Sequence, residues 1–535
     1  MLASLLSATL HGLDGRLIRV EVDVAPGLPG FTIVGLADTA LQEARERVRG
    51  AIRNSGYEYP PRRITVNLAP AEMRKSGASL DLAIALGILV GSEQVKANGR
   101  WAVIGELSLG GELRAMPGLL PMVAALARRR LKRVVVPLDG LTEAGLAGGI
   151  EVVPAATLAE AATLLRESRR GRARSRPPRV ELAADPIGEV ALRDCRAADR
   201  DSADRAGAGA AYADETPDVA EVRGQLEARR AIELSLAGGH SMVMIGPPGS
   251  GKTLLARTVP GLLPPLEDDE ARLATVIASV SGSEPVTALV RTRPFRAPHH
   301  TISYAAMVGG GPHLSPGEVT LANDGILFLD ELPEFDRSTL EALRQPLEAG
   351  QVAISRVGRA AVFPARFQLI AAMNPCPCGH AGEGDGRCRC SSVTVDRYTG
   401  RISGPLRDRI DLWVHMPRVE PADYVAAAAP EGSAAVRGRI VEARRRQQDR
   451  GERPNSRLTG RALRAACALG PAEQAHAIRL AELEGWSARG IERLLRVART
   501  AADLAGAEVV DGSHLDEAAR FRSPSGARSA YEAVM

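Results

Sequence analysis

Two hydrophobic periods alternate along the first 165 residues of the chain. Apolar β-branched residues recur at every second position in "LIRVEVDVAPG", and "RITVNLAP" and "RVVVP" are further runs of strand-forming residues. A helical period runs through "TALQEARERVRGAIRNSG" and ends at Gly56, while "SLDLAIALGILVG" and "LLPMVAALARRR" predict helices, the first of them buried. "WAVIGELSLGGEL" is typical of a hairpin with a Gly-Gly turn. We therefore predict an α/β domain over residues 1–165.

The periodic pattern stops at residue 166. Residues 166–179 contain seven arginines against one glutamate, and residues 181–215 are acidic or rich in alanine and glycine. Large apolar residues are few, so we predict a flexible linker over residues 166–215. Its arginines are open to two interpretations, a solvated linker or a nucleic-acid contact, and composition favours the first.

An α/β pattern returns over residues 216–425, and helical periodicity dominates residues 426–535. In "SARGIERLLRVARTAADLAG" the apolar residues fall on one helical face, with Ser487 as the expected N-cap. The face consists of positions 491, 494, 495, 498, 502 and 505. We therefore predict a multidomain α/β chain whose last domain is a bundle of helices.

Composition is that of an ordinary soluble protein. The 535 residues are 45% hydrophobic and 25% charged, and the net charge of +4 is small, so nucleic-acid binding must rest on local patches. The first residues carry no basic segment typical of a signal peptide, and no apolar run approaches the ~20 residues of a membrane span. We expect a cytoplasmic protein without membrane contact, in which thiols stay reduced.

The segment "SMVMIGPPGSGKTLLAR" places an apolar strand before a glycine-rich loop and a helix after it, which is the context of a P-loop. Backbone N–H groups of such a loop face phosphates at a helix N-terminus. The expected side-chain roles are the β- and γ-phosphates for Lys252 and Mg²⁺ for Thr253, so ATP and Mg²⁺ are the predicted cofactors. The predicted nucleotide-binding residues are Gly246, Pro247, Pro248, Gly249, Ser250, Gly251, Lys252 and Thr253.

Two further strands end in polar side chains. "GILFLDELPEF" closes in Asp330 and Glu331, which fits a buried parallel strand that delivers carboxylates to its carboxyl end. We expect Asp330 to hold the Mg²⁺ shell and Glu331 to polarise the attacking water, because water is a poor nucleophile without a base. The strand "FQLIAAMNP" ends in Asn374, whose amide is placed to position that water.

Four cysteines lie together after Asn374, in "MNPCPCGHAGEGDGRCRCSS". Cys376, Cys378, Cys388 and Cys390 form two Cys-x-Cys pairs in a glycine-rich loop that can turn back on itself, and four thiolates suit tetrahedral Zn²⁺. His380 is a possible substitute ligand, and the spacing is tighter than the usual Cys-x₂-Cys. Structural zinc is the favoured interpretation, with a redox pair and no special role as the alternatives. Cys195 and Cys467 are expected to be incidental.

With these motifs in place, the chain resembles an AAA+ ATPase. In that family Asn374 corresponds to the sensor-1 residue, and "GPLRDRIDL" resembles the arginine-finger segment, where Arg409 matches the finger more closely than Arg407. Arg489 matches the sensor-2 arginine. The resemblance implies a ring in which Arg409 completes the site of a neighbouring subunit. The alternative for Arg409 and Arg489 is a surface ion pair.

Two further segments indicate which branch of the family the chain resembles. One lies between the P-loop helix and Asp330, and the other is the hairpin "GQVAISRVGRAAVFPARFQ". Both resemble the helix-2 insert and the pre-sensor hairpin of the magnesium-chelatase-like branch. Nearly the whole chain, apart from the linker, is similar to the YifB/ComM family. That resemblance implies a homo-oligomer, expected to be a hexamer, that acts on single-stranded or branched DNA by branch migration or as a helicase, in recombination or natural transformation.

Three other functions compete with this interpretation. A magnesium-chelatase-like motor would remodel a protein partner, and a scaffold would carry a vestigial ATPase. A protease is the third, because "KSGASLDLAIALGIL" resembles the serine segment of Lon-type proteases, with Ser79 at the matching position and a ribosomal S5 domain 2-like fold implied. Leu120 stands where the family's lysine base would be, and leucine cannot accept a proton. We expect this Lon-like domain to be inactive in proteolysis and Ser79 to cap the following helix.

The resemblance also directs attention to basic side chains that would surround a pore. The expected phosphate contacts are Arg293, Arg296, His299 and His300 in the insert and Arg356 and Arg359 on the hairpin. For each one, a surface arginine or a structural histidine is the competing interpretation. No pattern of interleaved aromatics in these segments suggests base stacking, so sequence-independent tracking of the DNA backbone is expected.

Overall fold

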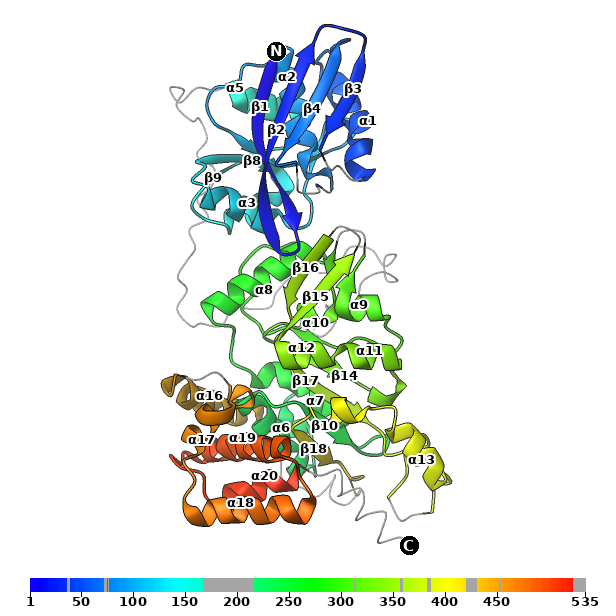
Figure 1. The fold of residues 1–535 in the computed structure, drawn as a ribbon, viewed down its shortest axis with the longest axis vertical. Coiled ribbons are helices and arrows are strands. Elements are labelled where there is room, and N and C mark those ends of the chain that lie inside the picture. Colours follow the sequence, from blue (N-terminus) through cyan, green and yellow to red (C-terminus); the bar gives the residue numbers. More distant parts are fainter. Residues whose placement is uncertain are drawn as a thin grey trace.

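The computed structural model shows a multidomain α/β chain built around two large sheets, with helices at its C-terminal end (Figure 1). Among the helices it describes, none is both long and apolar enough to cross a bilayer. The described residues are 1–35, 39–71, 75, 77–166, 216–311, 314–356, 359–382, 386–419, 431–451 and 454–522. The linker expected over residues 166–215 lies, apart from Arg166, outside this part of the chain.

The first sheet has seven strands in the order β3-β4-β2-β1-β5-β8-β9. The long β1 and β2 pair antiparallel, as do β2 and β4, and the remaining neighbours are parallel. Their bounds are β1 (Leu2–His11), β2 (Asp14–Ala25), β3 (Gly30–Val34), β4 (Arg63–Ala69), β5 (Ala102–Val103), β8 (Arg133–Pro137) and β9 (Glu151–Ala155). The period-two segments of the sequence are therefore confirmed as strands.

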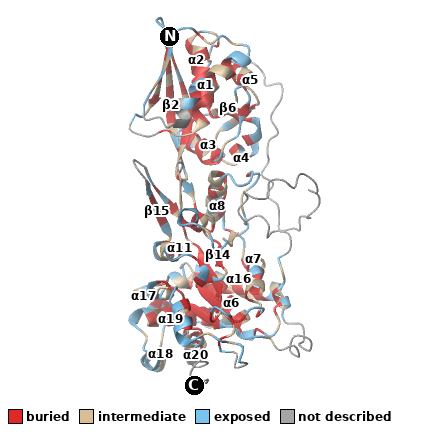
Figure 2. Ribbon diagram, turned by 90° about the vertical axis from the view of Figure 1, so that its right-hand side faces the viewer, coloured by how far each residue is buried: buried red, intermediate tan, exposed pale blue. Residues whose placement is uncertain are grey.

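Helices pack on this sheet as their apolar content predicts. Ten of the eleven residues of α2 (Asp81–Gly91) are buried, and Figure 2 shows this helix in red. The other helices are α1 (Thr39–Asn54), α3 (Leu119–Arg128), α4 (Leu141–Gly145) and α5 (Leu158–Arg166). The predicted hairpin is confirmed in a shorter form, as β6 (Glu106–Leu107) and β7 (Leu113–Arg114), because Ala102 and Val103 join the main sheet instead.

The expectation that Ser79 caps the following helix is wrong. Ser79 lies inside a short 3-10 helix, η1 (Ala78–Leu80), and the residue at the N-cap position of α2 is Leu80. The Ser79 hydroxyl is buried and has no hydrogen-bond partner among the described residues. Leu120 is buried in the first turn of α3, where its amide donates to Glu143 Oε1 at 2.9 Å.

The second sheet has five parallel strands in the order β11-β14-β17-β10-β18. Every residue of β14 and β17 is buried, which explains why the sequence shows continuous apolar runs there rather than alternation. Because the strands are parallel, all their carboxyl ends lie at one edge. The bounds are β10 (Met242–Ile245), β11 (Phe295–Arg296), β14 (Ile326–Leu329), β17 (Gln368–Met373) and β18 (Leu412–His415).

Helices cover this sheet, and an insert projects from it toward the first sheet (Figure 1). The hairpin β15 (Gln351–Arg356) and β16 (Arg359–Pro364) forms as predicted. It approaches the β1–β2 turn so closely that a Cβ on Gly12 would lie 3.2 Å from the Ala361 Cβ. The helices are α6 (Leu226–Gly238), α7 (Lys252–Leu262), α8 (Asp268–Ser281), α9 (Tyr304–Val308), α10 (Glu318–Leu321), α11 (Arg337–Ala342) and α12 (Arg344–Ala349), with the short pair β12 (Gly309–Gly310) and β13 (Ser315–Pro316).

The C-terminal helices pack against the second sheet through one shared core. In α19 (Ala488–Ala505) the predicted apolar face is largely confirmed, since Leu494, Ala498 and Ala502 are fully buried, and the Ser487 hydroxyl accepts from the Gly490 amide at 3.4 Å as the predicted N-cap. The other helices of this part are α13 (Ser392–Thr399), α14 (Gly404–Arg407), α16 (Ser433–Asp449), α17 (Gly460–Cys467), α18 (Pro471–Glu484) and α20 (Gly512–Arg520).

Candidate functional site

A tight glycine loop joins β10 to α7. Gly249 and Gly251 have φ of 80° and 92°, a backbone region that residues with a Cβ rarely adopt. A Cβ on Gly246 would collide with the Met416 carbonyl oxygen, so glycine is also required there by close packing. The loop ends with Lys252 as the first residue of α7, and its backbone N–H groups therefore lie at a helix N-terminus that favours anions.

The ammonium group of Lys252 lies inside this loop. Its Nζ donates to the carbonyl oxygens of Gly246 at 2.7 Å and Pro247 at 2.8 Å, and it lies 3.3 Å from Asn374 Oδ1. Burial lowers the pKa of Lys252, and the nearby carboxylates of Asp330 and Glu331 oppose that shift without cancelling it. A phosphate bound in the loop would place a negative charge next to this buried ammonium group.

The hydroxyl of Thr253 meets the end of β14. Thr253 Oγ1 donates to Asp330 Oδ2 at 2.8 Å, and Asp330 Oδ1 accepts from the Glu331 amide at 2.9 Å. A hydroxyl and a carboxylate side by side are hard oxygen donors of the kind that Mg²⁺ takes, usually together with waters and substrate phosphates. These two residues therefore fit a magnesium ion.

The structure thus brings together Lys252, Thr253, Asp330 and Asn374, which the sequence placed at the ends of three separate strands. The register explains why. Ile245, the last residue of β10, is paired with Met373, the last residue of β17, and Leu329, the last residue of β14, is paired with Ala371, so β14 ends only two residues before the other two strands. The next residues of each strand meet at the same edge of the sheet.

Glu331 lies beside this group but turns away from the strand. Its backbone has φ 52° and ψ 46°, the left-handed region, which is uncommon for a residue with a side chain and recurs at functional sites. Its carboxylate Oε2 is 3.3 Å from His300 Nδ1. Sequence reasoning missed this contact, because His300 follows β11, a strand of only two residues that periodicity does not reveal.

The four cysteines converge directly after the Asn374 position. The Sγ atoms of Cys376, Cys378, Cys388 and Cys390 all lie within 4.8 Å of one another. Cys376 Sγ is 3.3 Å from Cys378 Sγ and 3.8 Å from Cys388 Sγ, and Cys378 Sγ is 3.7 Å from Cys388 Sγ. Thiolates at 2.3 Å from a tetrahedral zinc would be separated by about 3.8 Å. The thiols are free rather than disulfide-bonded, and their arrangement fits one zinc ion.

The cysteine loop also contacts the P-loop. Gly379 packs so closely that a Cβ there would lie 2.6 Å from Pro248 Cδ. After the loop, Tyr398 of α13 hydrogen-bonds the backbone of Asn374, and burial, together with the Glu334 carboxylate, raises the pKa of its phenol to about 12. The loop is therefore part of the wall of the site.

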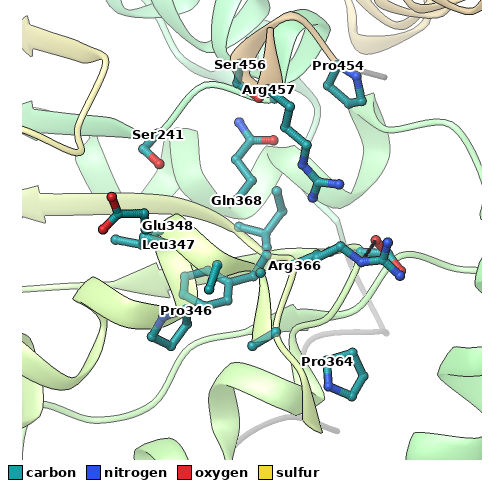
Figure 3. A pocket seen from close by; sticks show the side chains of 18 of the residues that line it. Ser241, Pro346, Leu347, Glu348, Pro364, Arg366, Gln368, Pro454, Ser456 and Arg457 are labelled. Carbon is teal, nitrogen blue, oxygen red and sulfur yellow. Dashed lines mark ion pairs between the residues drawn. The ribbon is translucent and has the colours of Figure 1, made fainter. Parts of the chain in front are cut away.

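Arg409 and Arg489 lie away from this group, together in a different cavity. The cavity has a volume of 1360 Å³, and none of the residues that line it belongs to the P-loop. Figure 3 shows Glu348 on one side of it and Arg366 and Arg457 on the other. The basic residues that line it are Arg293, Arg366, Arg409, Arg444, Arg457, Arg489, Arg493 and Arg496.

Arg409 is held at the wall of that cavity by Glu348, to which its Nη2 donates, and by the Pro405 carbonyl at 2.7 Å from its Nη1. The ion pair considered as the alternative for Arg409 thus forms, and its partner is Glu348. The Arg407 side chain instead donates from Nε to the Ile402 carbonyl at 3.1 Å and from Nη2 to the Thr399 carbonyl. These hydrogen bonds stabilise the segment that carries Arg407 itself.

Two expected phosphate contacts are already paired within the protein. Arg296 donates twice to Glu318, at 2.7 Å each, and Arg293 donates to Glu270 at 2.8 Å. These guanidinium groups are partly buried, so the structure favours a structural role for both. The side chains of Arg356 and Arg359 lie outside the described residues, although the two backbones pair at the tip of the β15–β16 hairpin.

Comparison with known proteins bears on this site. Residues 218–424 match the family described as magnesium chelatase, subunit ChlI, residues 20–140 match subunit ChlI of Mg-chelatase, and residues 430–522 match the ChlI C-terminal family. The chain is 41% identical to YifB of Escherichia coli over 96% of its own length and 95% of that protein. It is 37% identical to the competence protein ComM of Haemophilus influenzae, over 98% of the chain and 97% of ComM.

A shorter likeness links part of the chain to Lon protease 1 of Hydrogenovibrio crunogenus, at 25% identity over 24% of the chain and 17% of that protease. The sequence identity and the coverage of the full-length matches are high enough to show a common family. The matched regions include the P-loop, the strands of the second sheet and the C-terminal helices. The chain therefore belongs to the YifB/ComM family of magnesium-chelatase-like AAA+ proteins.

Proposed function

We propose that this protein is an ATP-hydrolysing ring motor that acts on DNA, by branch migration or as a helicase. The observation that carries the proposal is the contact set at one sheet edge, in which Lys252 reaches Asn374 and Thr253 reaches Asp330. A cation, hard oxygen donors and an amide converge there beside the N-terminus of α7, as phosphoryl transfer requires.

Each residue of the set has a role in hydrolysis. Lys252 binds the β- and γ-phosphates, and Thr253 and Asp330 hold Mg²⁺, which neutralises phosphate charge when it is bound. Asn374 orients the attacking water, and Glu331 accepts its proton as the oxygen bonds to the γ-phosphorus and the bond to ADP breaks. Inorganic phosphate and ADP are the products.

The position of Arg409 and Arg489 supports a ring. Both line a cavity without P-loop residues of their own chain, so neither is placed to reach its own nucleotide from there. A neighbouring subunit would bring its nucleotide to this cavity, and a guanidinium supplied across an interface is worth 10³ or more in turnover. We propose a hexamer, in keeping with the family resemblance and with the closed symmetry of most homo-oligomers.

The DNA part of the proposal rests on the relatives. ComM of Haemophilus influenzae is a competence protein, and natural competence concerns the uptake of DNA. Among the arginines expected to contact phosphate, Arg356 and Arg359 remain as candidates, since Arg293 and Arg296 pair with carboxylates. A tip with two arginines on each of several subunits would contact the DNA backbone without reading sequence.

The same comparison supports a proposal for the domain organisation. We propose a Lon-like domain at residues 1–165, a linker at 166–215, the ATPase core at 216–425 and the helical lid at 426–535. The short match to a Lon protease supports the first assignment. Proteolysis is not part of the proposal, because Leu120 is buried and apolar where a base would be needed.

DNA is expected to raise ATP turnover, because DNA bound in the pore would contact the hairpins of several subunits and hold the neighbouring sites together. The measurement is ATP hydrolysis without DNA and with single-stranded, duplex and four-way-junction DNA, over a salt series. Stimulation should fall steeply as salt rises, since phosphate contacts release counterions. If no DNA changes turnover even at low salt, the protein acts instead as a chelatase-like motor on a protein partner.

The cysteine cluster is proposed to hold one structural Zn²⁺. Four thiols this close cannot all ionise unaided: burial and the neighbouring thiols raise the pKa of Cys388 to about 12, whereas hydrogen bonds outweigh burial at Cys378 and lower its pKa to about 6. A bound cation would stabilise the thiolates together. The ion would also fix the loop that packs on Pro248.

Protein prepared without chelators is expected to contain about one zinc per chain. Replacing Cys376 and Cys388 together by serine should remove it, because two ligands of the tetrahedral set are lost. Metal analysis by mass spectrometry gives the zinc content of both proteins. Cys195→Ser, outside the cluster, is the matched control and should keep its zinc. A metal-free wild-type protein would contradict the proposal.

A further inference from the structure

One buried guanidinium group joins the two arginines that are proposed to act on a neighbouring nucleotide. Arg493 lies four residues after Arg489 in α19, about one helical turn away, and only 8% of its side chain is exposed. Its Nε donates to the Arg489 carbonyl oxygen at 3.3 Å. Its Nη1 donates to the carbonyl oxygen of Asp408, and its Nη2 donates to Asp408 Oδ1 at 3.4 Å. Because Asp408 directly precedes Arg409, the Arg493 side chain connects the backbones that carry both arginines.

The two connected segments belong to different parts of the fold. Arg409 follows α14, and its neighbours Leu406 and Ile410 are buried in the core that also contains β14 and β17. The helix α19 belongs to another core, which the C-terminal helices share with the second sheet and which includes Leu494. Arg493 therefore fixes a segment of the ATPase core relative to the helices of the lid.

The start of α19 is anchored by a second set of contacts. The Arg522 guanidinium lies over the ring of Trp486, 5.6 Å from its centre, directly before the Ser487 N-cap. The residue before it, Phe521, accepts a hydrogen bond from the Trp413 amide of β18 at 2.7 Å. The beginning of α19 is thus tied to the second sheet as well as to the segment around residue 408.

The chemistry of arginine suits this bridge. A buried cation needs hydrogen-bond partners, and a planar guanidinium with five N–H donors can reach two carbonyl oxygens at once. The ion pair between Arg493 and Asp408 contributes little by itself, because the side chain of Asp408 is 63% exposed. The hydrogen bonds to the two backbone carbonyls are therefore the contacts that explain a buried arginine at this position.

Two arginines can act together on one phosphate group only if their positions are fixed. Arg409 and Arg489 line the same cavity, which contains no P-loop residue of their own chain. Each has a long side chain that loses rotational freedom on binding, and a misplacement of about 1 Å at a reacting centre can cost 10²-fold in rate. A link between the two backbones keeps the arginines at a constant separation and so reduces that loss.

We propose that Arg493 is a positioning residue that holds Arg409 and Arg489 together, so that both guanidinium groups reach one phosphate group of the neighbouring subunit's ATP. The inference rests on the proposed ring motor and deepens it, because it names the contact through which the core and the lid present their arginines as one unit. Arg493 acts through these two residues and does not itself touch the nucleotide.

Three substitutions test the bridge. Arg493→Met keeps the length of the side chain without its donors, and Arg493→Lys keeps the positive charge but has one nitrogen, which cannot span both carbonyls. The lysine variant carries the test if methionine destabilises the fold. Arg446→Met is the control, since the partners of Arg446 in the described part of the chain are Glu442 and the Gly506 carbonyl at the other end of α19. The measurements are kcat and KM for ATP hydrolysis of the full chain with Mg²⁺, with thermal unfolding of each variant.

We expect both Arg493 variants to lower kcat on the order of tenfold to a hundredfold, less than the loss of Arg409 itself. KM for ATP should not change, because each chain's own P-loop binds the nucleotide. The Arg446 variant should stay close to wild type. A methionine variant as active as wild type, a fully active lysine variant, or a loss confined to KM would each overturn the inference.

Mixed rings show from which subunit Arg493 acts. Lys252→Ala chains can supply the arginines and Arg409→Ala chains an intact P-loop, so the mixture is expected to be active where the two meet. Adding Arg493→Lys to the Lys252→Ala chain should lower this activity by the factor seen with Arg493→Lys alone. Adding it to the Arg409→Ala chain should change nothing. A fall in the second mixture, alone or as well, would mean that Arg493 supports its own chain's site, and the inference would be wrong.

The same assays distinguish this inference from the function beneath it. If wild type does not hydrolyse ATP, the proposed function fails. If wild type is active and Arg409→Ala is not, while both Arg493 variants match wild type, the shared site stands and the role of Arg493 is refuted.

Discussion

Replacing Glu331 by glutamine is expected to lower the turnover of ATP by 10²–10⁴-fold, the usual contribution of a general base. The amide has nearly the shape of the carboxylate and can still meet His300, but it cannot accept a proton from water. Binding should survive, because Lys252, Thr253 and Asp330 are untouched. The variant should therefore hold ATP and stabilise the oligomer, which is measured by single-turnover hydrolysis and by size in solution with ATP present.

Glu334→Gln is the matched control for this experiment. Glu334 lies three residues further along, at the end of the short helix that begins at Leu332, and its carboxylate pairs with Arg401 at 2.9 Å on the surface. Loss of that exposed pair should leave turnover close to wild type, since exposed ion pairs contribute little. If Glu331→Gln continues to hydrolyse ATP at the wild-type rate, another group accepts the proton and the assignment of the base is wrong.

The part of the site that the sequence predicts is the part carried by buried parallel strands. Such strands appear as continuous apolar runs, and a polar residue at the end of each run lies at one sheet edge whatever the order of the strands. This is why Lys252, Asp330 and Asn374 could be brought together before their contacts were known. The cysteine loop was equally accessible, because its closeness along the chain limits how far apart the thiols can be.

The missed contacts come from elements that leave no periodic signal. The strand β11 is two residues long, and without it "APHHT" reads as a surface loop in which histidines are free to meet phosphate. Pairing between charges far apart in sequence is equally hidden, so Arg296 could not be assigned to Glu318, nor Arg409 to Glu348. Ser79 was misplaced because the 3-10 turn at residues 78–80 shifts the N-cap of the helix by one residue, to Leu80.

Arg409→Ala is expected to reduce the turnover of the assembled protein by 10³-fold or more, as loss of a guanidinium from a shared phosphoryl-transfer site does. The structure gives the reason: Arg409 lines a cavity that contains none of its own P-loop. Its side chain must leave Glu348 to meet a phosphate, and the stronger charge of a triphosphate favours that exchange. Arg401→Ala, which removes an exposed arginine of the same region, is the control and should remain active.

Mixing two inactive variants tests whether the site is shared between subunits. Lys252→Ala lacks the phosphate-binding cation but keeps Arg409, whereas Arg409→Ala keeps an intact P-loop. In randomly mixed rings about a quarter of the interfaces would unite an intact P-loop with an intact Arg409, so activity should return. Activity that stays absent in mixed rings, or an Arg409→Ala protein that hydrolyses ATP as fast as wild type, would show that each chain completes its own site. The two arginines in the cavity would then be ordinary surface groups, and the case for a ring would lose its physical basis.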